Sequence, residues 1–108
     1  ILIEPIQGEA GIVMPPAGYL KRLRDLCDRN NVLVLLDEIQ SGLGRTGRWV
    51  AHQPEALRAD GLIVRQALGG GVDPCSGFMA SGEIGPVGGR NHVHGYSASM
   101  LLVAGGRT

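Results

Sequence analysis

The sequence predicts an α/β fold, part of a larger domain in which helices flank a parallel sheet. Short apolar runs of strand length alternate with one helical pattern, which is typical of this class. The run at residues 32–36 is apolar throughout, as expected for a strand buried on both faces of a parallel sheet. A chain of 108 residues is long enough for one small domain at most.

The first part of the chain has the pattern of a strand, a turn and a helix. Residues 1–4 form a short apolar strand, and the glycines of residues 8–11 indicate a turn. Leu20, Leu23 and Cys27 then recur at helical spacing, so we expect them on the apolar face of a helix. On that face Cys27 is expected to be a small core residue rather than part of a disulfide or a metal site.

The later part of the chain alternates strands with loops. The strand at residues 32–36 ends abruptly at an acid, residues 62–64 form another short buried strand, and residues 78–80 are a candidate for a third. From Gly69 onward the chain is rich in glycine, which has a high entropic cost of ordering. We expect this region to be loop-like unless other polypeptide supports it.

Composition and charge exclude several classes of partner. The net charge is zero, with 10 basic and 10 acidic residues, which argues against nucleic acid or an anionic membrane. No apolar run reaches the roughly 18 residues of a membrane span.

We expect a cytoplasmic protein, although both ends read as cuts through a larger fold, and a mitochondrial targeting segment ahead of Ile1 would not be visible. His92 and His94 lack nearby acids or thiols, so no metal site is expected.

Asp37 lies where the apolar strand at residues 32–36 ends. Open parallel sheets bind their ligands at this carboxyl edge. A carboxylate there is costly to remove from water unless a cation meets it. Position alone leaves two interpretations open, a ligand-binding acid and a solvated acid in a loop.

Residues 42–47 match the spacing G-x-G-x-x-G. In a dinucleotide-binding domain this turn follows a strand at once and opens a helix, and Asp60 would then be the acid that binds the ribose. Here five residues, two of them acidic, separate the motif from the strand, and no clear helix start follows. We favour a binding loop that carries Arg45 and Arg48.

Residues 4–11, 37–47 and 67–71, in this order and spacing, resemble the class III, fold-type I aminotransferases, and within them the ornithine branch. The resemblance implies that residues 1–80 are part of the large domain that binds pyridoxal 5'-phosphate. It implies that residues 81–108, where the match is poor, are a glycine-rich tail of the same domain. The implied activity transfers an amino group between an amino acid and a 2-oxo acid, in a homodimer or with a complementing chain.

The resemblance assigns roles to residues of the first two motifs. Asp37 corresponds to the carboxylate that pairs with the protonated pyridine nitrogen of the cofactor and so keeps the ring an electron sink. Ile39 would pack on one face of the ring, and Gln40 would form a hydrogen bond near its phenolic oxygen. Glu9 corresponds to a glutamate that, in the ornithine branch, pairs with an arginine outside this chain and helps to select the substrate.

The sequence departs from the family at Arg65 and Gln66, where the family has glycine and the Schiff-base lysine. That lysine binds the cofactor covalently and then moves the proton at the substrate α-carbon. A carboxamide can do neither, and Lys21, the only lysine, lies far back on the predicted helix. We therefore expect no covalent cofactor link in this chain and no transamination by the chain alone.

A second departure concerns the family threonine that reaches the cofactor phosphate of the neighbouring subunit. One alignment places Ser97 at that threonine and another places Gly95 there, and Ser97 is the candidate phosphate ligand. Two other functions stay open at this point. The chain could be a non-catalytic module that associates with another aminotransferase chain, or a dinucleotide-binding domain.

Overall fold

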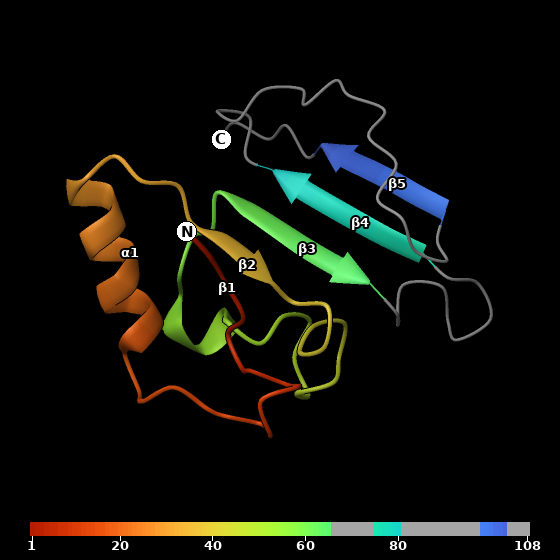
Figure 1. Ribbon diagram of the computed structural model, residues 1–108, viewed down its shortest axis with the longest axis horizontal. Coiled ribbons are helices and arrows are strands. Elements are labelled where there is room, and N and C mark those ends of the chain that lie inside the picture. Colours follow the sequence, from red (N-terminus) through yellow and green to blue (C-terminus); the bar gives the residue numbers. More distant parts are fainter. Residues whose placement is uncertain (66–74, 81–97, 104–108) are drawn as a thin grey trace.

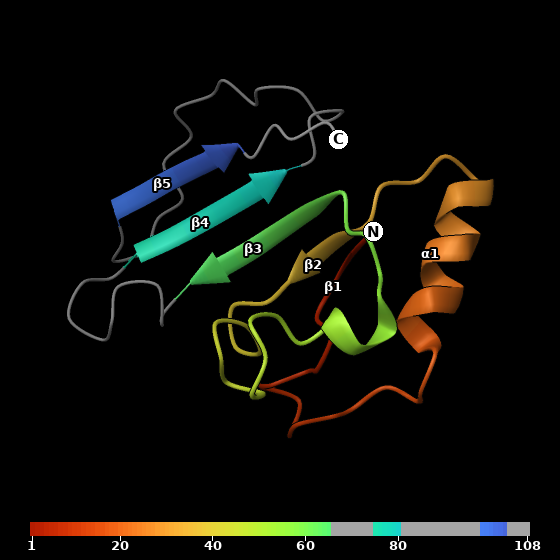
Figure 2. The same cartoon turned by 180° about the vertical axis from the view of Figure 1, so that it is seen from behind.

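The computed structural model describes residues 1–65, 75–80 and 98–103. In chain order the elements are β1 (Leu2–Ile3), α1 (Tyr19–Arg29), β2 (Leu35–Asp37), the 3-10 turn η1 (Gln53–Glu55), β3 (Gly61–Arg65), β4 (Cys75–Ala80) and β5 (Ala98–Val103). All the strands belong to one sheet in the order β1-β2-β3-β4-β5, with α1 to one side of β1 and β2 (Figures 1 and 2). The predicted α/β class is confirmed.

The sheet is mixed rather than wholly parallel. β1, β2 and β3 run parallel to one another, and β5 runs parallel to β4. β4 reverses the direction, because it pairs antiparallel with β3. The carboxyl ends of β1, β2 and β3 therefore meet at one edge of the sheet, and β2 and β3 reach it side by side, with Asp37 opposite Ile63.

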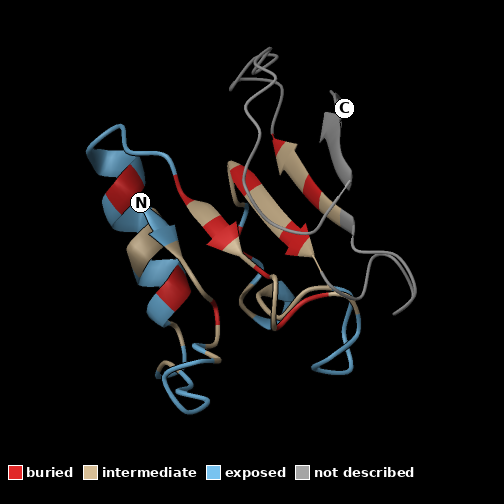
Figure 3. Cartoon of the chain, turned by 45° about the vertical axis from the view of Figure 1, so that its right-hand side comes forward, coloured by how far each residue is buried: buried red, intermediate tan, exposed pale blue. Residues whose placement is uncertain are grey.

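Helix α1 packs on the sheet through the predicted apolar stripe. Leu20 and Cys27 are 3% and 1% exposed and belong to one core cluster with Val34 and Leu36, while Leu23 packs against this cluster. Cys27 is a free core cysteine, as predicted. Figure 3 marks buried residues in red on both α1 and β2.

The carboxylate of Glu55 caps the amino end of α1 from a distant part of the chain. It accepts hydrogen bonds from the backbone amides of Gly18 and Lys21, at 3.2 and 3.1 Å. The residue that precedes the helix, Gly18, offers no side chain for this task. An acid at this end satisfies free amides and complements the helix dipole, so η1 and α1 stabilise each other.

The prediction of a strand over residues 32–36 is wrong at its start. Val32 and Leu33 are 37% and 51% exposed, and β2 begins only at Leu35. The Val32 amide still bonds to the carbonyl of Cys27, and the Val34 amide donates to the carboxylate of Asp60 instead of a neighbouring strand. An apolar run does not reveal where strand pairing starts.

The glycine-rich region holds more structure than predicted. β4 confirms the candidate strand at residues 78–80, and β5, which the sequence did not predict, pairs with β4 along its whole length. Gly61 lets β3 lie close to both of its neighbours, because a Cβ there would lie 2.6 Å from Leu35 of β2 and 2.9 Å from the Phe78 ring of β4. Pairing with β3 supplies the backbone hydrogen bonds that the composition of this region does not predict.

Several predicted residues lie outside the described part of the chain: Gln66, the pair His92 and His94, and Ser97. Within the described residues no three histidine, cysteine or acidic side chains gather as a metal site. The described helices include none with the length and apolar character needed to cross a membrane.

Asp60 ties α1 to the sheet. Its carboxylate accepts hydrogen bonds from Arg24 Nη1 at 2.5 Å and from the Val34 amide at 2.7 Å. Burial by itself raises the pKa of Asp60, but the Val34 amide and the Arg24 guanidinium outweigh it and hold that pKa below its usual value. The ionised form of Asp60 is therefore the form that stabilises the fold.

Asp60→Asn is expected to lower the free energy of unfolding by about 2 kcal/mol, because it removes charge-assisted hydrogen bonds from a partly buried site. Urea denaturation followed by circular dichroism measures this change. Because the folded pKa is lowered, the stabilisation is present above the unfolded pKa and is lost as the pH falls through the folded value. Asp25→Asn, at an exposed position of the same helix, is the control. Equal urea midpoints for wild type and Asp60→Asn at neutral pH would contradict this role.

Candidate functional site

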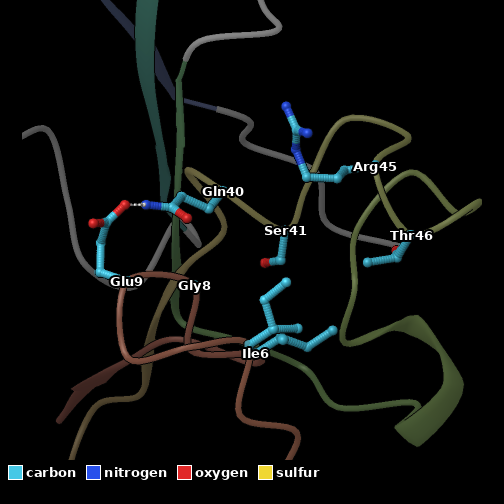
Figure 4. Close-up of a pocket in the computed structure, with 8 residues that line it drawn as sticks. Ile6, Gly8, Glu9, Gln40, Ser41, Arg45 and Thr46 are labelled. Carbon is cyan, nitrogen blue, oxygen red and sulfur yellow. Dashed lines mark hydrogen bonds between the residues drawn. The ribbon is translucent and has the colours of Figure 1, made fainter.

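Several polar and charged side chains gather at the carboxyl edge of the parallel strands. The turn that follows β1 and the loop that follows β2 lie against each other there, and both contribute side chains (Figure 4). Parallel pairing of β1 with β2 brings the two chain segments to the same edge. This is the edge at which sheets of this type bind ligands.

Asp37 is the last residue of β2, so its predicted place at the end of the strand is confirmed. Its side chain alternates with that of Leu36, which faces the core under α1, and therefore lies on the other face of the sheet. One carboxylate oxygen accepts a hydrogen bond from the Ile39 amide at 3.0 Å. Among the described residues no basic side chain forms an ion pair with this half-buried acid.

Glu9 and Gln40 form a hydrogen bond with each other. Gln40 Nε2 donates to Glu9 Oε1 at 2.6 Å, and this bond joins the turn after β1 to the loop after β2 (Figure 4). The backbone at Gly8 approaches so closely that a Cβ there would lie 1.9 Å from Gln40 Oε1. The structure thus brings two predicted site residues together. The close approach of Gln40 to the backbone explains why residue 8 is a glycine.

An open hollow of about 550 Å³ lies between the two loops. Its lining combines apolar side chains with polar and charged ones: Ile6, Gly8, Glu9, Ile12, Gln40, Ser41, Arg45 and Thr46. Glu9 and Arg45 bring opposite charges to it, from opposite sides of the view in Figure 4. Asp37 and Ile39 do not line the hollow, so the structure brings Glu9 and Gln40 into it but not the other two predicted residues.

Glu38 is a functional candidate that the sequence analysis missed. Its side chain is fully buried and accepts hydrogen bonds from Ser41 Oγ, from the amides of Ala51 and His52, and from His52 Nδ1. Burial raises the pKa of this carboxyl, but the four donors outweigh it and bring the pKa below its usual value. The alternation with Leu36 was the available signal, since it places Glu38 on the buried face.

The loop of residues 42–47 closes on itself and opens no helix. The Leu43 amide donates to the carbonyl of Trp49 at 2.7 Å, and the segment that follows consists of turns until η1. Asp60, the candidate ribose acid, is bonded to Arg24 and Val34 instead. The geometry does not favour a dinucleotide site here.

Gly8→Ala is expected to break the bond between Glu9 and Gln40, because the added methyl overlaps the Gln40 amide. The side-chain amide resonances of Gln40 in an NMR spectrum measure this, since their shifts depend on the hydrogen bond to Glu9. The overlapped atoms are the far end of a flexible side chain, so Gln40 can move aside and the main effect falls on the hydrogen bond. Ala10→Ser, at an exposed position of the same turn, serves as control. Gln40 resonances in Gly8→Ala that match the wild type would refute the close contact.

Comparison with known proteins gives consistent results. The family model described as aminotransferase class-III matches residues 1–104. An ornithine aminotransferase of Exiguobacterium sp. is 58% identical over 83 residues, which are 77% of this chain and 21% of the relative. The chain therefore spans about a fifth of the length of this curated relative.

Two solved structures extend the comparison. An ornithine aminotransferase from Toxoplasma gondii, described with partial occupancy of PLP at its active site, matches with a TM-score of 0.66 and 48% identity. The match covers 68% of this chain and 17% of that one. An N-acetylornithine aminotransferase from Stenotrophomonas maltophilia matches with a TM-score of 0.63 and 48% identity, over 65% of this chain and 19% of its own.

Proposed function

The chain belongs to the class III aminotransferases, and from that membership we propose that it forms the part of a pyridoxal 5'-phosphate-dependent transaminase that holds the pyridine ring. The complete enzyme transfers an amino group between an amino acid and a 2-oxo acid, with ornithine as the amino donor. When bound, the cofactor supplies a ring that withdraws electrons from the substrate α-carbon. The relatives of this chain supply the ornithine assignment.

The observation that carries this proposal is Asp37. It is a half-buried carboxylate at the carboxyl end of β2, and no basic side chain of the described residues pairs with it. Such an acid is stabilised by an external cation, and a protonated pyridine nitrogen is one that also donates a hydrogen bond. The Ile39 amide fixes one oxygen of the carboxylate and so orients the group. In this proposal the Ile39 side chain packs on a face of the ring.

Gln40 and Glu9 complete the proposed site next to the hollow. Gln40 donates a hydrogen bond to the phenolic oxygen of the ring, and Glu9 helps to select the substrate. The hydrogen bond of 2.6 Å between the two side chains links these roles. A substitution of either residue removes this bond and so alters the orientation of the other side chain. Ser97, outside the described residues, is the proposed phosphate ligand.

The proposed cofactor domain includes the whole chain. Residues 1–80 supply the ring-binding edge, and residues 81–108 form a tail of the same domain. Exposed large apolar side chains are consistent with a further partner, either a second copy or a complementing chain. Ile12, Met14 and Trp49 are 74%, 71% and 77% exposed, and exposed apolar surface of this kind can serve as an interaction site.

Gln66 is proposed to stand at the position of the Schiff-base lysine. A carboxamide is no nucleophile and does not titrate near neutral pH, so it can neither bind the cofactor covalently nor move a proton. In this proposal the chain holds the cofactor without a covalent bond and does not transaminate by itself.

Asp37→Ala is expected to weaken the binding of pyridoxal phosphate about tenfold to hundredfold, because one charge-assisted hydrogen bond is worth roughly 1.5–3 kcal/mol. Trp49 is the only tryptophan, so quenching of its fluorescence by the added cofactor gives the dissociation constant. Asp25→Ala removes an exposed acid of α1 and should leave that constant unchanged. Equal dissociation constants for wild type and Asp37→Ala would rule out the proposed contact.

Gln66→Lys is expected to restore a covalent link to pyridoxal phosphate, because it returns an amine to the proposed position of the nucleophile. Borohydride reduction followed by mass spectrometry detects the link. The wild-type chain should gain no cofactor mass at position 66. Gln53→Lys places a lysine at an exposed position away from the site and controls for non-specific trapping. Failure of Gln66→Lys to trap more cofactor than Gln53→Lys would contradict the assignment of Gln66.

A further inference from the structure

We infer that Glu38 and His52 are positioning residues for the candidate site. Their bond fixes the loop of residues 41–52, here called the clamp loop, against the end of β2. The clamp loop carries Ser41, Arg45 and Thr46 into the hollow, and its order sets where they stand. The effect on loop order depends on the geometry alone, whereas the effect on cofactor binding rests on the function proposed above.

The hydrogen bonds of Glu38 use both of its carboxylate oxygens. Oε1 accepts from the His52 amide at 3.1 Å and from His52 Nδ1 at 2.8 Å. Oε2 accepts from Ser41 Oγ at 2.7 Å and from the Ala51 amide at 3.0 Å. An ionised carboxylate only accepts, so it can serve all four donors at once. A side-chain amide in its place would turn an N–H toward at least one of these donors.

The backbone of Glu38 is fixed as firmly as its side chain. Its amide donates to the carbonyl of Ile63 at 2.9 Å and so extends the pairing of β2 with β3. Its carbonyl accepts from the Gly42 amide at 2.9 Å, and a Cβ on Gly42 would lie 2.7 Å from that carbonyl oxygen. Glu38 thereby joins the sheet to both ends of the clamp loop.

The position of Glu38 in the chain connects this anchor to the site. Asp37 precedes it and Ile39 and Gln40 follow it, so a shift of Glu38 moves all three proposed ring-binding residues. The alternation of the strand sends Glu38 to the buried face and Asp37 to the other face. An apolar residue at position 38 could fill the same space, but it would leave the partly buried amides of Ala51 and His52 without their acceptor.

His52 contributes a donor that a conservative substitution can test. Because the carboxylate only accepts, Nδ1 must carry the hydrogen in this bond. Asparagine can place its side-chain N–H where Nδ1 stands, whereas leucine has a similar size and no donor. A purely space-filling role for His52 would not distinguish between these two variants.

The test uses the full chain and compares His52→Leu, His52→Asn and Glu38→Gln with the exposed control Gln53→Ala. Fluorescence anisotropy of Trp49, the only tryptophan and a member of the clamp loop, measures loop order without any cofactor. We expect lower anisotropy in His52→Leu and Glu38→Gln, and wild-type anisotropy in His52→Asn and the control. The dissociation constant for pyridoxal phosphate should rise about tenfold in His52→Leu and Glu38→Gln. In His52→Asn it should return to the wild-type value.

Each outcome decides a separate question. Wild-type anisotropy in His52→Leu and Glu38→Gln would overturn the inference, as would a loss in His52→Leu that His52→Asn does not restore. If Glu38→Gln is unfolded by circular dichroism, Ser41→Ala removes a single donor and should lower the anisotropy by a smaller amount. Failure of the wild-type chain to bind pyridoxal phosphate would reject the proposed function, while the anisotropy would still test the anchor. Cofactor affinity that stays constant while loop order falls would overturn the positioning role.

Discussion

Two acids follow one another at the carboxyl end of β2, and the alternation of the strand sends them to opposite faces of the sheet. Glu38 continues the buried face of Leu36 and is satisfied within the chain by four donors. Asp37 lies on the other face, and it forms none of the ion pairs found among the described residues. This difference is the basis of the two proposed roles, in which Glu38 organises the loop and Asp37 binds a positively charged ligand.

This division explains the glycines around the site. Gly42 lets the backbone turn tightly over Glu38, and Gly8 lets the turn after β1 reach Gln40. In both cases a methyl group would overlap an atom whose position the site depends on. Other contacts join residues that are far apart in the sequence. Asp60 bonds to Arg24 of α1 and to Val34 just before β2, and Glu55 of η1 caps the amino end of α1. The Asp60 contact lies at the amino ends of β2 and β3, and the Glu55 contact lies at the amino end of α1.

The sequence predicted the parts that depend on local periodicity. The helical stripe with Cys27 and the acid at the end of β2 follow from spacing alone. The start of β2 was predicted too early, because an apolar run does not show which residues have a neighbouring strand. β5 was missed although residues 100–103 are an apolar run, because the many glycines of the surrounding region favoured the prediction of a loop.

Contacts between distant residues were beyond reach of the sequence. The path of the clamp loop decides that His52 meets Glu38, and no periodic pattern encodes this. Gln40 meets Glu9 across two loops for the same reason. The family resemblance supplied roles for Asp37, Ile39, Gln40 and Glu9, which the bare pattern of residues could not distinguish from solvated side chains. The resemblance did not predict the hydrogen bonds between Glu38 and the clamp loop, because these depend on the path of the folded chain.

The central claim is that Asp37 holds a positively charged pyridine ring. It can be tested with pyridoxal phosphate carrying ¹⁵N in the ring, bound to the wild-type chain and examined by NMR above the pKa that the ring nitrogen has in free solution. The account predicts a nitrogen resonance at the position of the protonated ring, because the carboxylate retains the proton there. A bound cofactor with the resonance of an unprotonated nitrogen would contradict the claim.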